Sequence, residues 1–101
     1  MWVVAMFDLP VDTAAARRAY TKFRHGLLQD GFTMMQYSVY IRHCATEENV
    51  KVHCERVKSI LPDDGEVRVI TITDFQFGKM QVFLGRRRKA PVAAPAQVEM
   101  F

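Results

Sequence analysis

A short apolar segment near the start of the chain, closed by an acidic residue and a proline, is the feature that most limits the fold. Residues 2–7 are all apolar, and Asp8, Leu9 and Pro10 follow them. A run of this length is typical of a β-strand buried on both faces, which is the position of a central strand. Proline has no N–H for the next ladder hydrogen bond, so the strand is expected to end there.

Asp8 is therefore predicted to place a carboxylate at the carboxyl end of a central strand. Two roles are open for it: such strand ends often hold ligands or metals, or the residue terminates or caps the turn before the first helix. Mg²⁺ is usually bound by one or two carboxylates and waters. One Asp8 from each protomer of a dimer would form a shared Mg²⁺ site, where the metal could activate water for phosphodiester cleavage. Asp8 is thus the candidate catalytic and metal-binding residue.

The length and composition favour one small domain. The chain has 101 residues, half of them hydrophobic. A domain of this size buries only about 60% of its unfolded surface and is marginal alone, so a homodimer is expected. No stretch approaches the roughly 20 apolar residues that span a membrane. The amino terminus lacks the basic segment of a secretory signal, so we expect a cytoplasmic protein with no membrane partner.

The positive charge is concentrated at the carboxyl end. Residues 86–101 carry four basic residues against Glu99, which accounts for the net charge of +3, and residues 1–85 are neutral overall. The rest of the end segment is rich in Pro and Ala, a composition typical of flexible linkers. We therefore predict a domain over residues 1–85 and a basic, flexible tail over 86–101. The tail either frays or docks on another protein by strand addition.

The remaining pattern predicts two helices and three more extended segments. Helix 13–29 begins behind Asp12 or Thr13, and helix 47–61 behind Thr46. Their apolar stripes comprise Ala16, Tyr20, Phe23 and Leu27 in the first, and Val50, Cys54, Val57 and Leu61 in the second. Residues 32–43 are predicted to form a bent or bulged pair of strands, and residues 66–73 alternate as a strand.

This β-α-β-β-α-β order predicts an α+β protein. Two helices on one face of a four-stranded antiparallel sheet is the ferredoxin-like sandwich, with the first and third strands central. Residues 75–80 then lead into a fifth short strand, 81–84, closed by Gly85. An exposed edge invites pairing with another chain, so this extra C-terminal strand is expected to be exchanged in the homodimer. The alternative is that it packs back on its own sheet.

Two His-Cys pairs suggest a zinc site, but their spacing argues against one. His43 and Cys44 are adjacent, as are His53 and Cys54. Adjacent residues point in different directions on a strand or helix, and zinc ligands usually lie two to four residues apart. Two cysteines in a cytosolic chain are expected to be reduced thiols. Cys54 is expected to be a small core residue rather than a nucleophile.

Because the common catalytic motifs are absent, Asp8 and its polar neighbours are the remaining candidate reaction centre. The chain contains no P-loop, dinucleotide fingerprint, HExxH or Ser-His-Asp arrangement. Ser38 and Tyr40 are auxiliary candidates that could orient water or phosphate. Basic side chains could neutralise nucleic-acid phosphates without reading bases. The candidates for nucleic-acid binding are Arg17, Arg18, Lys22, Arg24, Arg42 and Lys79.

An ordered set of motifs over residues 1–85 resembles the CRISPR-associated Cas2 family. The segments that carry the resemblance are Asp8-Leu9-Pro10, Arg17-Arg18-Ala19-Tyr20, Lys22-Phe23-Arg24, Gly31-Phe32, Met35-Gln36, Ser38-Val39-Tyr40, Val67 to Thr73, Gln76-Phe77 and Leu84-Gly85. The resemblance implies a ferredoxin-like homodimer that works in CRISPR adaptation. There the dimer sits between integrase subunits and helps to hold the double-stranded DNA that becomes a new spacer.

The resemblance also implies an alternative activity. Some family members are described as metal-dependent endonucleases on RNA or double-stranded DNA, with the residue that matches Asp8 as metal ligand. The leading hypothesis is therefore a DNA-binding scaffold that acts with the integrase subunit in spacer acquisition, and the alternative is a Mg²⁺-dependent endonuclease. A ferredoxin-like regulatory module for a small ligand is a third reading, because fold alone does not fix function.

Overall fold

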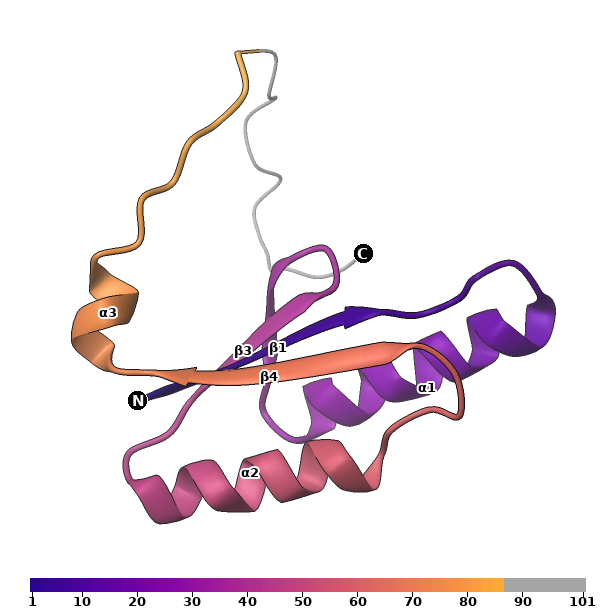
Figure 1. The fold of residues 1–101 in the computed structure, drawn as a ribbon, viewed down its shortest axis with the longest axis horizontal. Coiled ribbons are helices and arrows are strands. Elements are labelled where there is room, and N and C mark those ends of the chain that lie inside the picture. The colour runs from indigo at the N-terminus through magenta and orange to yellow at the C-terminus, as the bar shows by residue number, and fades with distance from the viewer. Residues whose placement is uncertain (87–101) are drawn as a thin grey trace.

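The computed structural model describes residues 1–86 and has the predicted architecture (Figure 1). The elements, in order, are β1 (Trp2–Asp8), α1 (Ala14–Gln29), β2 (Thr33–Gln36), β3 (Val39–His43), α2 (Glu47–Ser59), β4 (Glu66–Ile72) and α3 (Asp74–Gly78). The four strands form one antiparallel sheet in the order β2-β3-β1-β4. The ferredoxin-like α+β fold is confirmed, with β1 and β3 central.

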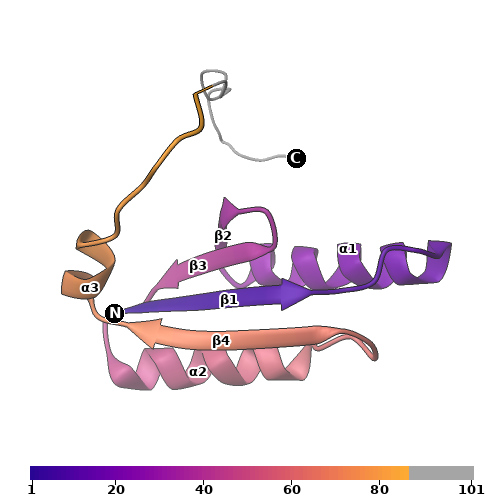
Figure 2. The same cartoon turned by 45° about the horizontal axis from the view of Figure 1, so that its top comes forward.

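The two faces of the sheet have different environments. Val3, Ala5 and Phe7 of β1 are buried in one core cluster with Phe23 and Leu27 of α1 and with residues of α2. Both helices therefore pack on this face, and the other side of the sheet carries neither of them (Figure 2). Because strand side chains alternate, Asp8 lies on that other side, which we call the open face.

The helix starts follow the predicted caps, whereas the end of α2 does not. The Thr13 hydroxyl accepts a hydrogen bond from the Ala16 amide at 3.0 Å, and Thr46 does the same at the start of α2. The prediction that α2 continues to Leu61 is wrong, because the helix ends at Ser59 and Leu61 is 48% exposed. Pro62 disfavours the helical conformation of the residue before it, which accounts for the early end.

A buried ion pair that the sequence did not reveal joins the two helices. The carboxylate of Asp30, just after α1, accepts hydrogen bonds from His53 Nδ1 at 2.7 Å and from Arg56 Nη1 at 2.8 Å. The Asp30 carbonyl oxygen accepts another from Arg42 Nε. Burial works against the charged carboxylate, but the hydrogen bonds from Arg56 and His53 lower the pKa of Asp30 below 3.8. Asp30 therefore links α1, α2 and β3.

Replacing Asp30 with alanine is expected to lower the free energy of unfolding at pH 7 by about 3 kcal/mol, because the change leaves the buried His53 ring without its carboxylate partner. The folded-state pKa of Asp30 is depressed, so its contribution is present above pH 3.8 and disappears as the pH falls through the folded-state value. Urea denaturation at a series of pH values measures this. The difference in the free energy of unfolding between wild type and Asp30→Ala should become smaller towards acid pH. The exposed control variant, Asp63→Ala, should stay close to wild type. A gap that is independent of pH would contradict the prediction.

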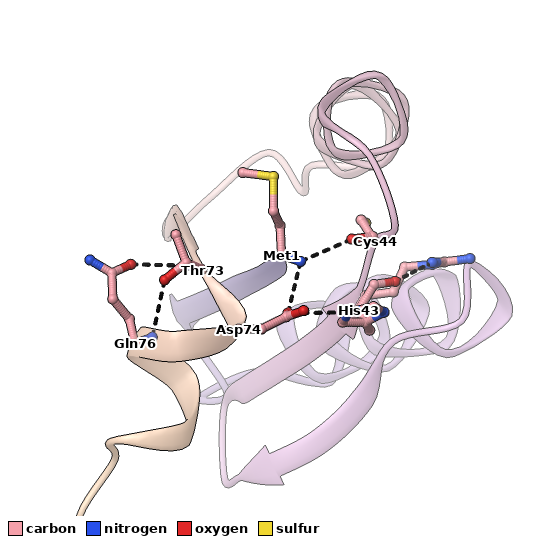
Figure 3. A network of polar contacts seen from close by, with 7 residues as sticks. Met1, His43, Cys44, Thr73, Asp74 and Gln76 are labelled. Carbon is pink, nitrogen blue, oxygen red and sulfur yellow. Dashed lines mark hydrogen bonds and ion pairs between the residues drawn. The ribbon is translucent and has the colours of Figure 1, made fainter.

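The segment after β4 is helical where the sequence suggested the approach to a strand. Thr73 and Gln76 form a capping box in which each side chain accepts a hydrogen bond from the other residue's amide, and this starts α3 (Figure 3). The Asp74 carboxylate contacts the Met1 amino group at 2.8 Å and His43 Nε2 at 3.2 Å. The hydrogen bond from the amino terminus is the main cause of the lowered pKa of Asp74. The ring of Phe77 stacks on Trp2, with centroids 4.1 Å apart.

The predicted fifth strand has no strand partner within the described chain. Residues 79–86 run away from the sheet in both views (Figures 1 and 2). Val82, Phe83 and Leu84 are 64–84% exposed, and within residues 1–86 this segment pairs with neither edge of the sheet. The alternative of packing back on its own sheet is therefore wrong for this chain, and exchange with a second copy stays a prediction. The predicted tail beyond residue 86 lies outside the described residues.

Candidate functional site

Asp8 ends β1 on the open face, with its side chain exposed. Phe7, its neighbour, points into the core and packs edge-on against Phe23 of α1. Within residues 1–86 the Asp8 carboxylate accepts no hydrogen bond, and Thr13 is the residue that caps α1. Asp8 therefore does not cap the first helix, although it does end β1 at the turn before that helix. The carboxylate is accessible to a ligand.

A second carboxylate, which sequence patterns did not predict, lies opposite Asp8. The register of β1 and β4 pairs Asp8 with Glu66. Directly opposed residues of an antiparallel pair share a face, with Cβ atoms about 4.5–5.5 Å apart. Glu66 accepts a hydrogen bond from Arg68 Nε at 3.2 Å, and both side chains are mostly exposed. The pairing of residues 8 and 66 depends on the strand register, for which the sequence alone held no signal.

Gly65 fixes the backbone beside Asp8. Its φ is +97°, in the left-handed region that favours glycine. A Cβ at this position would lie 2.8 Å from the Asp8 carbonyl oxygen and 2.6 Å from a Leu9 methyl group. Any other residue would have to push the end of β1 aside. The glycine therefore allows the turn before β4 to pass directly against the strand end that carries Asp8.

The side chains of the two auxiliary candidates contact residues of the helix side of the sheet. Tyr40 is 1% exposed, and its ring stacks on Phe7 in the core, so its proposed role in orienting water is wrong. It is buried because its register partner is Ala5, on the helix side of β1. The Ser38 hydroxyl lies 3.3 Å from the Tyr20 hydroxyl of α1, and the Ser38 carbonyl accepts a hydrogen bond from the Phe7 amide. Burial raises the pKa of Tyr20.

The basic candidates lie in separate places. Arg17, Arg18 and Lys22 line a groove of about 1030 Å³ between α1 and the segment after α2, which we call the α1 groove. It also contains His25 and a single carboxylate, Asp63. The α1 groove is in the helix layer, on the opposite side of the sheet from Asp8. It combines three cations in one hollow, an arrangement suited to a phosphate backbone.

The other three basic candidates are not part of the α1 groove lining. Arg24 is half-buried on α1. Arg42 donates from Nε to the Asp30 carbonyl oxygen and from Nη1 to the His43 carbonyl oxygen, so it closes the end of α1 against β3. The Lys79 ammonium lies over the ring of Phe75, 4.9 Å from the centroid. The structure therefore brings together three of the six residues that were predicted to bind nucleic acid.

The donor atoms around Asp8 fit Mg²⁺. Carboxylate oxygens are the ligands that this hard cation prefers, and it usually takes one or two of them together with waters or substrate phosphates. Asp8 offers an uncommitted carboxylate, and Glu66 adds negative charge beside it. Among the described residues, no group of three or more His, Cys, Asp or Glu side chains is placed to hold a metal. Waters, a phosphate or a second protomer would complete the coordination.

The cysteines are not placed for nucleophilic chemistry. Cys44 is buried in the core cluster, and Cys54 is partly buried against it. Burial raises the pKa of the Cys54 thiol, which keeps it protonated. Separately, no helix in the described part of the chain is long and apolar enough to cross a membrane.

Comparison with known proteins gives consistent matches. The family model described as CRISPR associated protein Cas2 matches residues 1–80. A protein of Parvibaculum lavamentivorans named CRISPR-associated endoribonuclease Cas2 is 56% identical, and the match covers the full length of both chains. A protein of Flavobacterium psychrophilum with the same name is 43% identical over all of this chain and 88% of its own length.

One solved structure supports the fold. The crystal structure of Streptococcus pyogenes Cas2 at pH 6.5 matches with a TM-score of 0.54 and 21% sequence identity. The match covers 82% of this chain and all of that one. The sheet with two helices on one face is therefore an architecture that an experimentally determined chain also adopts.

Proposed function

Because this chain belongs to the CRISPR-associated protein Cas2 family, we propose that it is a Mg²⁺-dependent endoribonuclease in which Asp8 holds the metal ion. The observation that carries the proposal is the exposed Asp8 carboxylate at the end of a central strand, without a hydrogen-bond partner in residues 1–86 and with Glu66 opposite it. The two relatives described above are both named endoribonucleases, which favours RNA as the substrate.

The proposed reaction is hydrolysis of a phosphodiester bond. A water oxygen bonds to phosphorus, while the bond from phosphorus to the leaving ribose oxygen breaks and its electron pair stays on that oxygen. The water gives up one proton and the leaving oxygen gains one, so the products are a phosphate monoester and an alcohol. When bound, Mg²⁺ supplies Lewis-acid polarisation of the phosphate and lowers the pKa of water. Asp8 supplies the carboxylate that holds the cation.

We further propose that the working form is a homodimer built on the open face. The apolar side chains of this face, placed by the strand register, are Trp2, Val4, Met6, Val39, Ile41, Ile70 and Ile72. Ile70 is half-exposed and the others are partly exposed, apart from Val4, which is buried. Exposed apolar side chains gathered on one face favour an interaction site there. A second copy facing it would bring two Asp8 carboxylates towards one shared groove. The apolar residues 82–84 could then pair with the partner's sheet edge.

The test is cleavage of a short RNA by the full-length wild-type protein and by Asp8→Asn, with Mg²⁺ or with a chelator. We expect the wild type to cleave the RNA, to stop when the metal is removed and to resume when Mg²⁺ is restored. We expect Asp8→Asn to cleave far more slowly. Double-stranded DNA of the same sequence is compared in parallel, which distinguishes the two substrate classes. Cleavage that is equal in both proteins would reject the proposal.

The α1 groove favours a second function, a scaffold for double-stranded DNA that acts with the CRISPR integrase subunit in acquiring spacers. Arg17, Arg18 and Lys22 in one hollow provide sequence-independent phosphate contacts. Two such grooves in a homodimer would follow one duplex. The two functions use opposite faces of the sheet, so they are separable by mutation.

The double substitution Arg18→Gln/Lys22→Gln is expected to weaken duplex DNA binding and to reduce the slope of log K against log salt by roughly 1 for each phosphate that the variant no longer neutralises. Fluorescence anisotropy over a salt series measures both effects. The matched control is Lys51→Gln/Lys58→Gln, which removes the same charge from exposed positions on α2. An equal decrease of slope in both double variants would assign the effect to net charge and contradict a specific groove.

A further inference from the structure

We propose that Arg68 binds the non-bridging oxygens of the scissile phosphate at the Asp8 site, and that Glu66 is the positioning residue that orients it. This inference rests on the proposed endoribonuclease function and adds a substrate-binding cation to it. The inference is based on four neighbouring residues, Met6 and Asp8 on β1 and Glu66 and Arg68 on β4.

The strand register places Arg68 on the same face as Asp8. Asp8 is opposite Glu66, and Met6 is opposite Arg68. The intervening pair, Phe7 with Val67, points to the other side, where both contact the core. Arg68 is thus the diagonal neighbour of Asp8, at a Cα separation of about 7–8 Å that long side chains can bridge. A phosphate held near Asp8 would lie within reach of the guanidinium.

The Arg68 guanidinium donates a hydrogen bond from Nε, and its two terminal nitrogens are available to a ligand. Arg68 Nε donates to Glu66 Oε1 at 3.2 Å. Within residues 1–86 no acceptor binds its two terminal nitrogens, and the side chain is 72% exposed. A single bond at Nε leaves the planar pair of terminal N–H groups free to form the bidentate contact that arginine makes with phosphate oxygens. Glu66 therefore acts as an orienting partner on the strand.

The charges are arranged as phosphodiester cleavage requires. In the pentacoordinate transition state, the non-bridging oxygens carry more negative charge than they do in the substrate. A cation held by Asp8 and the Arg68 guanidinium would both neutralise part of this charge, and such preorganised contacts stabilise the transition state. The ion pair alone does little for folding, since exposed pairs contribute about 0–1 kcal/mol. Substituting Arg68 should therefore leave the fold intact.

The experiment compares Arg68→Gln, Arg68→Lys and Glu66→Gln in the full-length protein, with Lys58→Gln as a matched loss of one exposed charge on α2. Arg68→Gln is expected to lower kcat for RNA cleavage by about 100-fold. Arg68→Lys should recover part of that loss, because it restores the charge without the planar fork. The affinity for Mn²⁺, followed by electron paramagnetic resonance as a probe of the Asp8 site, should stay at the wild-type value in Arg68→Gln.

The Glu66→Gln variant tests whether Glu66 acts on cleavage only by positioning Arg68. If Glu66 acts through Arg68, the double variant Glu66→Gln/Arg68→Gln should have the same kcat as Arg68→Gln alone. A double variant that is clearly slower than Arg68→Gln alone would give Glu66 a role independent of Arg68 and overturn its positioning role.

The cleavage activity of Asp8→Asn shows whether a negative result concerns only Arg68 or also the proposed endoribonuclease function. If Asp8→Asn is inactive but Arg68→Gln stays within about threefold of wild type, the role of Arg68 is rejected and the proposed function stands. If the wild type does not cleave, or Asp8→Asn cleaves as well as the wild type, both are rejected.

Discussion

Asp8→Asn is expected to reduce Mg²⁺-dependent RNA cleavage by more than about 100-fold, because even the partners of metal ligands typically contribute 10–100-fold. The substitution keeps the shape of the side chain and removes the negative charge that binds the cation. Within residues 1–86 nothing hydrogen-bonds to the Asp8 carboxylate, so folding should be unaffected. Initial rates with a labelled RNA measure the loss, and a thermal melt checks the fold.

Asp63→Asn is the matched control for this prediction. Asp63 is an exposed aspartate in the α1 groove, on the helix side of the sheet. The same chemical change there should leave the cleavage rate close to wild type. Residual cleavage by Asp8→Asn that persists in the presence of chelator would indicate a metal-independent activity and contradict the assignment of Asp8.

Ile70→Asp is expected to convert the homodimer to a monomer, with the dimer dissociation constant raised by at least about 100-fold, since burying an unpaired carboxylate costs several kcal/mol. Ile70 lies on the open face beside Val4 and is 50% exposed in the single chain. The monomer should therefore tolerate the substitution, while an interface on this face should not. Analytical ultracentrifugation across a concentration series measures the change.

Val52→Asp is the control for the dimer prediction. Val52 is a similarly exposed apolar residue, 44% exposed, on the outer side of α2. A charge there should leave the association unchanged if the dimer forms through the open face. Dimers that persist in Ile70→Asp but dissociate in Val52→Asp would place the interface on the helix layer and contradict our proposal. In that case the two Asp8 carboxylates would not share a groove.

Most of the fold could be predicted because its signals are local. The apolar run before Asp8 correctly predicted a central strand, and Thr46 correctly predicted where α2 begins. Of the two candidate caps of the first helix, Asp12 and Thr13, the structure uses Thr13. The bulge expected between residues 32 and 43 is present in the pairing of β2 with β3. These features arise from side-chain periodicity and from hydrogen bonds between residues three or four apart, so a short window of sequence contains them.

The expectation that residues 75–80 only lead into a fifth strand missed the helix α3. Thr73 and Gln76 form the capping box that starts this helix. The helix is also held by contacts that no local pattern shows, because Phe77 stacks on Trp2 from the other end of the chain. A specific cap and a distant aromatic partner together account for the helix.

Sequence patterns were enough to predict the elements as far as β4, the position of Asp8 at a strand end and the candidate basic residues. Which of these residues meet follows from the fold, which pairs Asp8 with Glu66, buries Tyr40 and gathers Arg17, Arg18 and Lys22 in one groove. Strand register and helix placement are set by closing one hydrophobic core. That closure joins residues far apart in the chain, and no local propensity encodes it.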